Sequence, residues 1–246
     1  MSPSPKPPLI AVIATALLGL TAIAGGASAI VHDLTREPTE AEKRAAADAE
    51  AADRWRMRTA SEIFPARVDQ RTDGISRGEV IYTALRVGIA SPASCGAAFD
   101  ARVAAVLAKY GCRTTLRATY VDGSRTLAST LGVAVLPDAA RATKAGGELS
   151  TMLGFRGAKG REGLRTVPFA GTVAAAYTDS LRQEFWFNAD NSPYVFFSSS
   201  GWLTGRGTPE KGRVVESFHF ARYGLQQVER LFGANGPACE RRGVRC

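Results

Sequence analysis

The stretch EVIYTALRVGIASPASCGAAFDARVAAVLAKYGCRTTLRATYVDG, residues 79–123, decides the fold of this chain. Residues 79–90 are rich in β-branched and aromatic side chains, which predicts a strand. A helix capped by Ser94 or Asp100 follows, because apolar residues recur at helical spacing up to the glycine that should end it. Residues 113–121 then predict a second strand, so the stretch reads as strand, helix, strand.

The residues that follow continue the same alternation. Asp122-Gly123 is a strong turn signal, and residues 127–136 predict a third strand. A short helix, DAARATKA, should end at Gly146-Gly147. This order favours an α+β fold with a mostly antiparallel sheet and helices on one face, ferredoxin-like in its first half.

The C-terminal part predicts further elements of the same domain. Residues 166–178 and 194–200 are expected to be strands. Phe185-Trp186-Phe187 forms an aromatic cluster, for which core packing is favoured over a binding surface. The segment 214–232 is expected to finish the fold as a helix whose apolar face holds Leu225, Val228, Leu231 and Phe232.

The N-terminal stretch LIAVIATALLGLTAIAGGASAIV, residues 9–31, carries no charge. Its length predicts a transmembrane helix, which would leave residues 1–8 as a cytoplasmic tail. The alternative is a signal peptide cleaved near Ala29, after the small-residue site Ala27-Ser28-Ala29. Both interpretations export the residues that follow to the outer side of the membrane.

Between the membrane and the domain, residues 32–63 predict a helical stalk or linker. Thr39 and Glu42 have the spacing of a capping box, and a run rich in Ala, Glu and Arg follows them. The extracytoplasmic domain is then expected over residues 64–233, with a C-terminal tail over 234–246.

The net charge of the chain is +8, and the whole excess lies beyond residue 62. A basic exported domain is attracted to anionic surfaces, so the expected partners are the lipid bilayer through residues 9–31 and an anionic envelope polymer or a protein. Nucleic acid is disfavoured, because the predicted location is outside the cell and no nucleic-acid motif occurs.

All four cysteines lie on the predicted outside, where disulfides are plausible. Cys239 and Cys246 could close a short terminal loop. Cys95 and Cys112 could pair only if the helix between them starts late, since a helix filling the interval would separate them by about 20 Å, whereas a disulfide requires about 7 Å between Cα atoms. No CxxC motif supports a thioredoxin-like role.

The runs SCGAAFDARVAAVLAKYGCRTTLRATYVDG (94–123) and LGVAVLPD (131–138) resemble an uncharacterised actinobacterial family of single-pass membrane-anchored proteins. The resemblance covers about residues 60–140 of this chain. It implies an N-terminal anchor and an extracytoplasmic α+β domain, and it implies no activity.

The glycine-rich run GFRGAKGREGLR, residues 154–165, is the candidate ligand-binding segment. Glycine exposes backbone N–H groups, and the cations between the glycines could cradle a phosphate or carboxylate. These cations are Arg156, Lys159, Arg161 and Arg165. The run is not a Walker A loop, and a solvated loop is the favoured alternative.

No motif for catalysis, a metal or a cofactor is present. The two histidines, His32 and His219, lack ligand spacing, and the serines at 198–200 lie in no nucleophile elbow. The sequence therefore predicts no catalytic residue and favours a non-catalytic module that binds a ligand or partner at the cell surface. The alternatives are a cell-envelope enzyme of hydrolase type and a membrane assembly factor.

Overall fold

The computed structural model describes residues 36–71, 80–153, 162–204 and 218–232. The chain forms two compact units, Met1–Lys43 and Arg44–Cys246. The described elements, in chain order, are α2 (Glu40–Met57), α3 (Ala60–Ile63), β1 (Arg67–Arg71), β2 (Val80–Ala93), α4 (Cys95–Ala98), α5 (Ala101–Lys109), β3 (Thr114–Asp122), β4 (Leu127–Val135), α6 (Ala139–Leu153), η1 (Val173–Ala176), η2 (Asp179–Leu181), β5 (Arg182–Ala189), β6 (Tyr194–Trp202) and α8 (His219–Phe232).

The described part of the first unit is residues 36–43, which contain the start of helix α2. The Glu42 N–H donates to Thr39 Oγ1 at 3.3 Å, and the Thr39 N–H donates to Glu42 Oε2 at 2.8 Å, which confirms the predicted capping box. A hydrogen bond from Arg36 and weaker contributions from those of Thr39 lower the pKa of Glu42 to about 2. None of the described helices has the length and apolarity needed to cross a bilayer, and the predicted span 9–31 lies outside the described residues.

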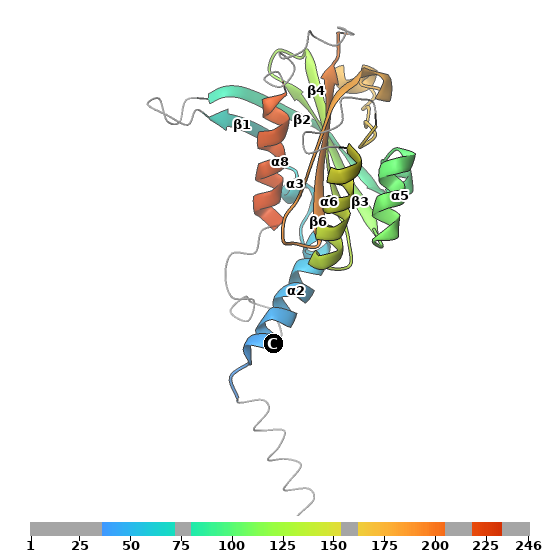
Figure 1. Cartoon of the computed structure of the whole chain (residues 1–246). Helices are drawn as coiled ribbons and strands as arrows, with labels where there is room; N and C mark the ends of the chain where they lie inside the picture. Colours follow the sequence, from blue (N-terminus) through green and yellow to red (C-terminus); the bar gives the residue numbers. More distant parts are fainter. Residues whose placement is uncertain (1–35, 72–79, 154–161, 205–217, 233–246) are drawn as a thin grey trace, which may run out of the picture. The chain divides into compact units, whose positions relative to one another are not determined.

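The second unit is built on a six-stranded sheet in the order β1-β2-β3-β4-β6-β5 (Figure 1). All of its strand pairs are antiparallel, which confirms the predicted α+β class with an antiparallel sheet. The ferredoxin-like arrangement was wrong. That arrangement needs a strand inserted between the two that flank the first helix, whereas β2 pairs directly with β3.

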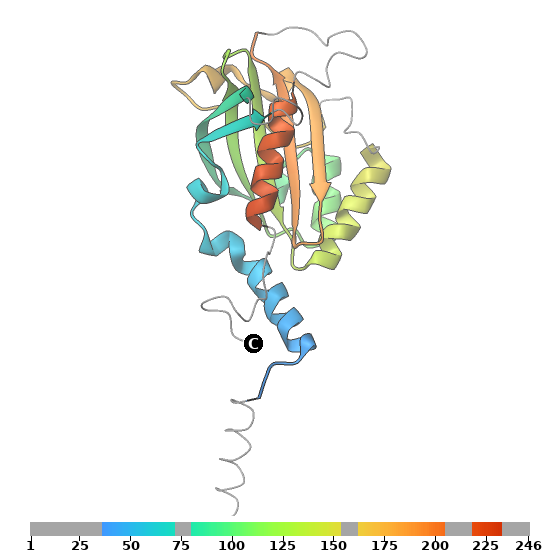
Figure 2. The same cartoon turned by 90° about the vertical axis from the view of Figure 1, so that its left-hand side faces the viewer.

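Helices cover both faces of the sheet, so the prediction of helices on one face was wrong (Figures 1 and 2). On one side, called the α8 face, Leu131 and Phe196 belong to the core that packs against α8. On the other side, called the opposite face, Ala134 and Phe197 belong to the core that packs against α5 and α6. The reason is visible in β4, which is buried at every position and therefore needs cover on both sides.

The helical excursion between β2 and β3 leaves and returns at the same end of the sheet. Ala93 and Thr115 are cross-strand partners, so the connection over residues 94–113 starts and finishes at adjacent positions on the sheet. Strand β2 runs through Ala93, three residues past its expected end, because its last residue still pairs with β3.

The connection between β2 and β3 contains two helices rather than one. The Ser94 hydroxyl accepts from the Ala97 N–H and caps α4, and α5 begins only after Asp100. This late start is the condition predicted for a disulfide across the helix. Cys95 and Cys112 are indeed bonded, with their Cα atoms 6.3 Å apart.

Helix α6 continues to Leu153, so the predicted end at Gly146-Gly147 was wrong. A Cβ at Gly146 would lie 2.6 Å from the Cβ of Ala189 in β5. The glycine therefore allows the helix to approach the edge strand closely, and it does not end the helix.

The aromatic cluster packs into both faces of the sheet, which confirms the predicted core role. Phe185 and Phe187 lie beside Phe197 on the opposite face, with ring centroids 5.8 and 6.3 Å away. Trp186 points to the α8 face, where the guanidinium of Arg222 lies 4.4 Å from its ring centroid.

Helix α8 presents the predicted apolar face, with Leu225, Val228 and Phe232 buried and Leu231 half-buried. Its last carbonyl, that of Phe232, accepts a hydrogen bond from Arg54 of α2, whose side chain is almost completely buried. The C-terminal half of α2 therefore packs onto the end of α8 within the second unit.

Candidate functional site

The half of the opposite face nearest the β3–β4 turn is covered by residues 162–181, called the cover segment. The expected strand over 166–178 was wrong. This part of the segment has no strand pairing and contains only the short helix η1 and the start of the turn into η2. Its apolar residues suggested a strand, but the segment is attached through individual side chains.

The cover segment starts on the short connection between α4 and α5. Leu164 forms an isolated antiparallel bridge with Phe99. The Arg165 N–H donates to the Ala98 carbonyl at 2.8 Å, and the Asp100 N–H donates to the Gly163 carbonyl at 3.0 Å. The backbone of the segment is thus fixed at the point where the chain enters the site.

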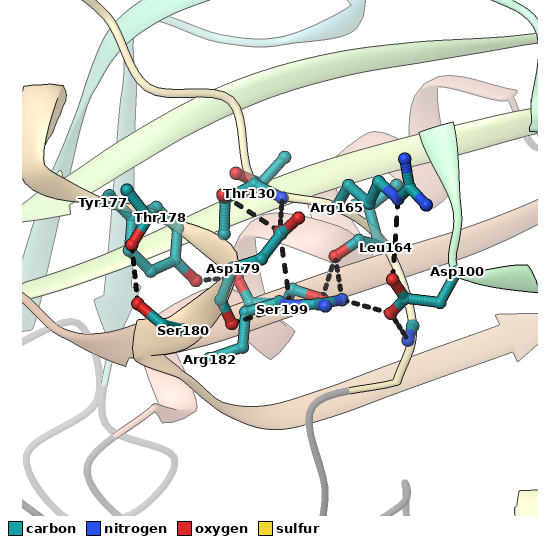
Figure 3. Close-up of polar contacts among 12 residues, drawn as sticks. Asp100, Thr130, Leu164, Arg165, Tyr177, Thr178, Asp179, Ser180, Arg182 and Ser199 are labelled. Atoms are coloured by element: carbon teal, nitrogen blue, oxygen red, sulfur yellow. Dashed lines mark hydrogen bonds and ion pairs between the residues drawn. The ribbon is translucent and has the colours of Figure 1, made fainter. Parts of the chain in front are cut away.

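A buried arginine and two partly exposed aspartates form the centre of the site (Figure 3). Arg182, whose side chain is 6% exposed, donates to Asp100 Oδ2 at 2.6 Å and lies 3.3 Å from Asp179 Oδ1. The Thr166 N–H donates to the same Asp179 oxygen at 2.8 Å. Arg182 also donates to the Leu164 carbonyl at 3.2 Å, so one guanidinium joins both ends of the cover segment to the sheet.

Asp100 occupies the N-cap position of α5, but its carboxylate makes no capping bond. It accepts instead from Arg182 and from the Gly163 N–H at 2.8 Å. Burial raises the pKa of Asp100, but hydrogen bonds from Arg182 and Gly163 and the charges of Arg182 and Arg165 outweigh burial and lower the pKa below its ordinary value. The carboxylate is therefore ionised at neutral pH, and it binds Arg182 and the Gly163 N–H instead of capping the helix.

A ring of three hydrogen bonds fastens the middle of the segment to the sheet. Thr119 Oγ1 donates to the Val167 carbonyl at 2.8 Å, and the Val167 N–H donates to Thr130 Oγ1 at 3.2 Å. The two threonine oxygens are 3.0 Å apart. Because the Thr119 proton is already used, Thr130 donates to Thr119 and closes the ring.

Buried serine and tyrosine hydroxyls complete the attachment. Ser199 Oγ donates to the Leu164 carbonyl at 2.7 Å, and the Tyr177 hydroxyl donates to the Ser199 carbonyl at the same distance. Burial raises the pKa of Tyr177 far above its ordinary value, so this hydroxyl stays protonated.

Two further arginines lie at the edge of this centre. Arg165 is the outer one, with a side chain that is 45% exposed and an Nε atom 3.5 Å from Asp100 Oδ1 (Figure 3). Arg117, on β3, is half-buried, forms no ion pair with a described residue, and has a buried Nε atom without a hydrogen-bond partner. Three arginines therefore face two aspartates, which leaves one positive charge in excess.

No protein family, curated protein or solved structure matches this chain. The function is therefore inferred from the chemistry of these side chains.

Of the predicted ligand-binding cations, Arg165 lies in this site. Arg156, Lys159 and Arg161 lie outside the described residues, as do Cys239 and Cys246 of the candidate terminal loop. The side chain of His219 is likewise not described.

Groups for catalysis are poorly placed in the described part of the chain. Ser198, Ser199 and Ser200 are each at most 1% exposed, and they lie in the middle of the sheet. Across residues 36–71, 80–153, 162–204 and 218–232, no three His, Cys, Asp or Glu side chains form a group that could hold a metal ion.

The sequence reasoning missed Arg117, Asp179 and Arg182, and it assigned Asp100 only as a helix cap. One signal was available for Arg117, because it is a charged residue in the middle of a strand and its neighbours on both sides are buried. Arg182 and Asp179 carry no such signal, since their partners are up to 82 positions away.

Proposed function

We propose that this protein is a membrane-anchored extracytoplasmic module that binds an anionic partner at the cell surface without catalysing a reaction on it. Residues 9–31 would be the anchor. The resemblance of residues 94–123 to actinobacterial membrane-anchored proteins supports the same location. The Cys95–Cys112 disulfide also supports it, since such bonds persist mainly in oxidising compartments.

The observation that carries the binding role is the placement of Arg165. Its backbone is fixed by the hydrogen bond to Ala98 and by the bonds that Leu164 accepts from Ser199 and Arg182. Its guanidinium makes one long contact, to Asp100, and neither of its Nη atoms donates to another described residue. A fixed, half-exposed arginine with free donors is suited to a carboxylate, phosphate or sulfate group.

Retention on a charged polymer tests this proposal. The full-length chain in detergent micelles is passed over immobilised dextran sulfate and over plain dextran while the salt concentration is raised. We expect retention on dextran sulfate only, weakening with salt, because the contact is between exposed charges. Equal retention on the two resins would contradict the proposal.

Two arginine variants locate the effect. Arg165→Gln should elute at lower salt than the wild type. Arg113→Gln is the matched control, since Arg113 is exposed, lies just before β3 and forms no ion pair among the described residues. Both variants lose one positive charge, so identical shifts would mean that net charge alone, and not this site, governs retention.

A further inference from the structure

We propose that Arg117 and Arg165 together form a binding site for a phosphate group, an inference that rests on the anion-binding role proposed above and identifies its ligand and its inner residue. Arg165 would hold the outer side of the group and Arg117 the inner side. Neither residue is needed for the ion pairs that join Arg182 to Asp100 and Asp179.

The register of the sheet places Arg117 beside Arg165. Arg117 is the cross-strand partner of Gly132 in β4, so both residues face the same side of the sheet. A Cβ at Gly132 would lie 2.8 Å from Leu164 Cδ2, which shows that Leu164 sits directly over this pair. Arg165 follows Leu164 in the chain, and its charge is among those that act on Arg117.

Arg117 lacks the partners that every other part of the site has. Its Nε atom is buried and has no hydrogen-bond partner, and none of its nitrogens forms an ion pair with a described residue. Arg182, by comparison, contacts two carboxylates. A buried guanidinium N–H without an acceptor is unfavourable, and a bound oxyanion would supply that acceptor.

The local charges favour an anion at the same place. Burial lowers the pKa of Arg117, the charge of Asp179 opposes this effect, and the charge of Arg165 adds to it. The two arginines therefore repel each other while the aspartates are occupied by Arg182. A group with two negative charges between them would relieve both the repulsion and the missing hydrogen bonds.

Phosphate fits this arrangement better than a carboxylate does. A guanidinium donates two parallel hydrogen bonds to an oxyanion, and a phosphate monoester carries enough oxygens and charge for two such groups at once. Asp100 already supplies a carboxylate to Arg165, and only at 3.5 Å, so a phosphate oxygen would compete with the longest ion-pair contact of the site.

The test is a calorimetric titration of the full-length chain in dodecyl maltoside micelles, which contain no phosphate. Inorganic phosphate is the probe, and acetate at equal ionic strength is the comparison. We expect saturable phosphate binding, with acetate about tenfold weaker. Arg117→Gln and Arg165→Gln should each weaken phosphate binding by about tenfold, as expected for losing charged hydrogen bonds, and Arg113→Gln should leave it unchanged.

Arg117→Lys separates recognition from folding, because it keeps the charge of a half-buried residue but removes the two-pronged donor. It should keep the urea midpoint of the wild type and still bind phosphate several-fold more weakly.

A second arm of the experiment identifies the source of the phosphate. If phosphatidic acid in the micelles blocks inorganic phosphate, a lipid headgroup reaches the site, and if it does not, the ligand is a soluble or polymer-borne phosphate.

The outcomes distinguish the two proposals. Equal phosphate binding by the wild type, Arg117→Gln and Arg165→Gln would overturn this site, while salt-sensitive retention on dextran sulfate would still support the proposed function. If the wild type bound neither the polymer nor phosphate, both proposals would fail.

Discussion

The two faces of the sheet are covered by different means. Helix α8, together with Ile63 and Phe64 at the end of α3, covers one face through a continuous apolar core. The opposite face is divided, with α5 and α6 over one half and the cover segment, residues 162–181, over the other. The cover segment is held by hydrogen bonds to threonine, serine and aspartate side chains. An apolar cover depends on total buried area, whereas a polar cover depends on individual atoms and can therefore hold charged groups at fixed positions.

The largest expected effect comes from neighbouring phenylalanines that point to different faces. Phe196 packs beside Phe232 of α8, and Phe197 packs beside Phe99, with ring centroids 5.9 and 4.6 Å apart. Both are fully buried, so Phe196→Ala and Phe197→Ala should each lower the free energy of unfolding by about 3–5 kcal/mol. Urea denaturation measures both values. A much smaller loss for Phe196→Ala would show that the α8 face is not a main source of stability.

The second effect concerns the polar cover. Asp100→Asn removes the charge that faces Arg182 and turns an acceptor of the Gly163 N–H into an amide. We expect a loss of about 3 kcal/mol in the free energy of unfolding, because a buried guanidinium loses one of its two carboxylate partners. Asp53→Asn, at an exposed ion pair with Arg56, should cost less than about 0.5 kcal/mol.

The pH dependence of this second effect has a definite sign. The pKa of Asp100 is lower in the folded chain than its ordinary value of 3.8. The stabilisation is therefore present above pH 3.8 and is lost as the pH falls through the lower, folded value. A difference between wild type and Asp100→Asn that persisted in strong acid would contradict the ion-pair explanation.

The difference between the faces also explains what the sequence could predict. Strands β3 and β4 were predicted to within a residue from their local sequence, and the end of helix α5 followed from helical spacing, while its start was left open between Ser94 and Asp100. The pairing of β2 with β3 could not be predicted, since strand neighbours are decided by contacts distant in sequence. The continuation of α6 through Gly146 was missed for the same reason, because the cause is Ala189 on another strand.

The candidate site shows the same limit more strongly. Arg165 was predicted because it belongs to a basic, glycine-rich run. Asp100, Asp179 and Arg182 were not, because nothing in their local sequence shows that Asp100 meets a segment about 80 positions later in the chain. An irregular segment attached by side chains has no periodicity, so its hydrogen-bond partners become visible only once the register of the sheet is known.

The smallest expected effect tests a charged group on the α8 face. Burial raises the pKa of Glu229 in α8 to about 7. A hydrogen bond from Asn188 and the charge of Arg230 oppose this shift, whereas the charge of Asp190 adds to it. The folded chain holds this proton more tightly than the unfolded chain, so stability is full below about pH 4.5 and is lost as the pH rises to about 7. The ionised carboxylate is thus a weak point in the cover of the α8 face.

Glu229→Gln removes this weak point because the neutral amide needs no proton. The variant should equal the wild type near pH 4.5 and exceed it at pH 8 by about 1–2 kcal/mol, allowing for partial solvent screening of the carboxylate. Urea midpoints at several pH values measure the difference, and Glu162→Gln in the cover segment removes an equal charge from an exposed pair with Arg102. Phosphate binding should be identical in wild type and Glu229→Gln at every pH, because Glu229 lies on α8 and the arginines lie on the opposite face. If Glu229→Gln changed phosphate affinity instead, the two faces would be coupled, and the division between a stabilising face and a binding face would be wrong.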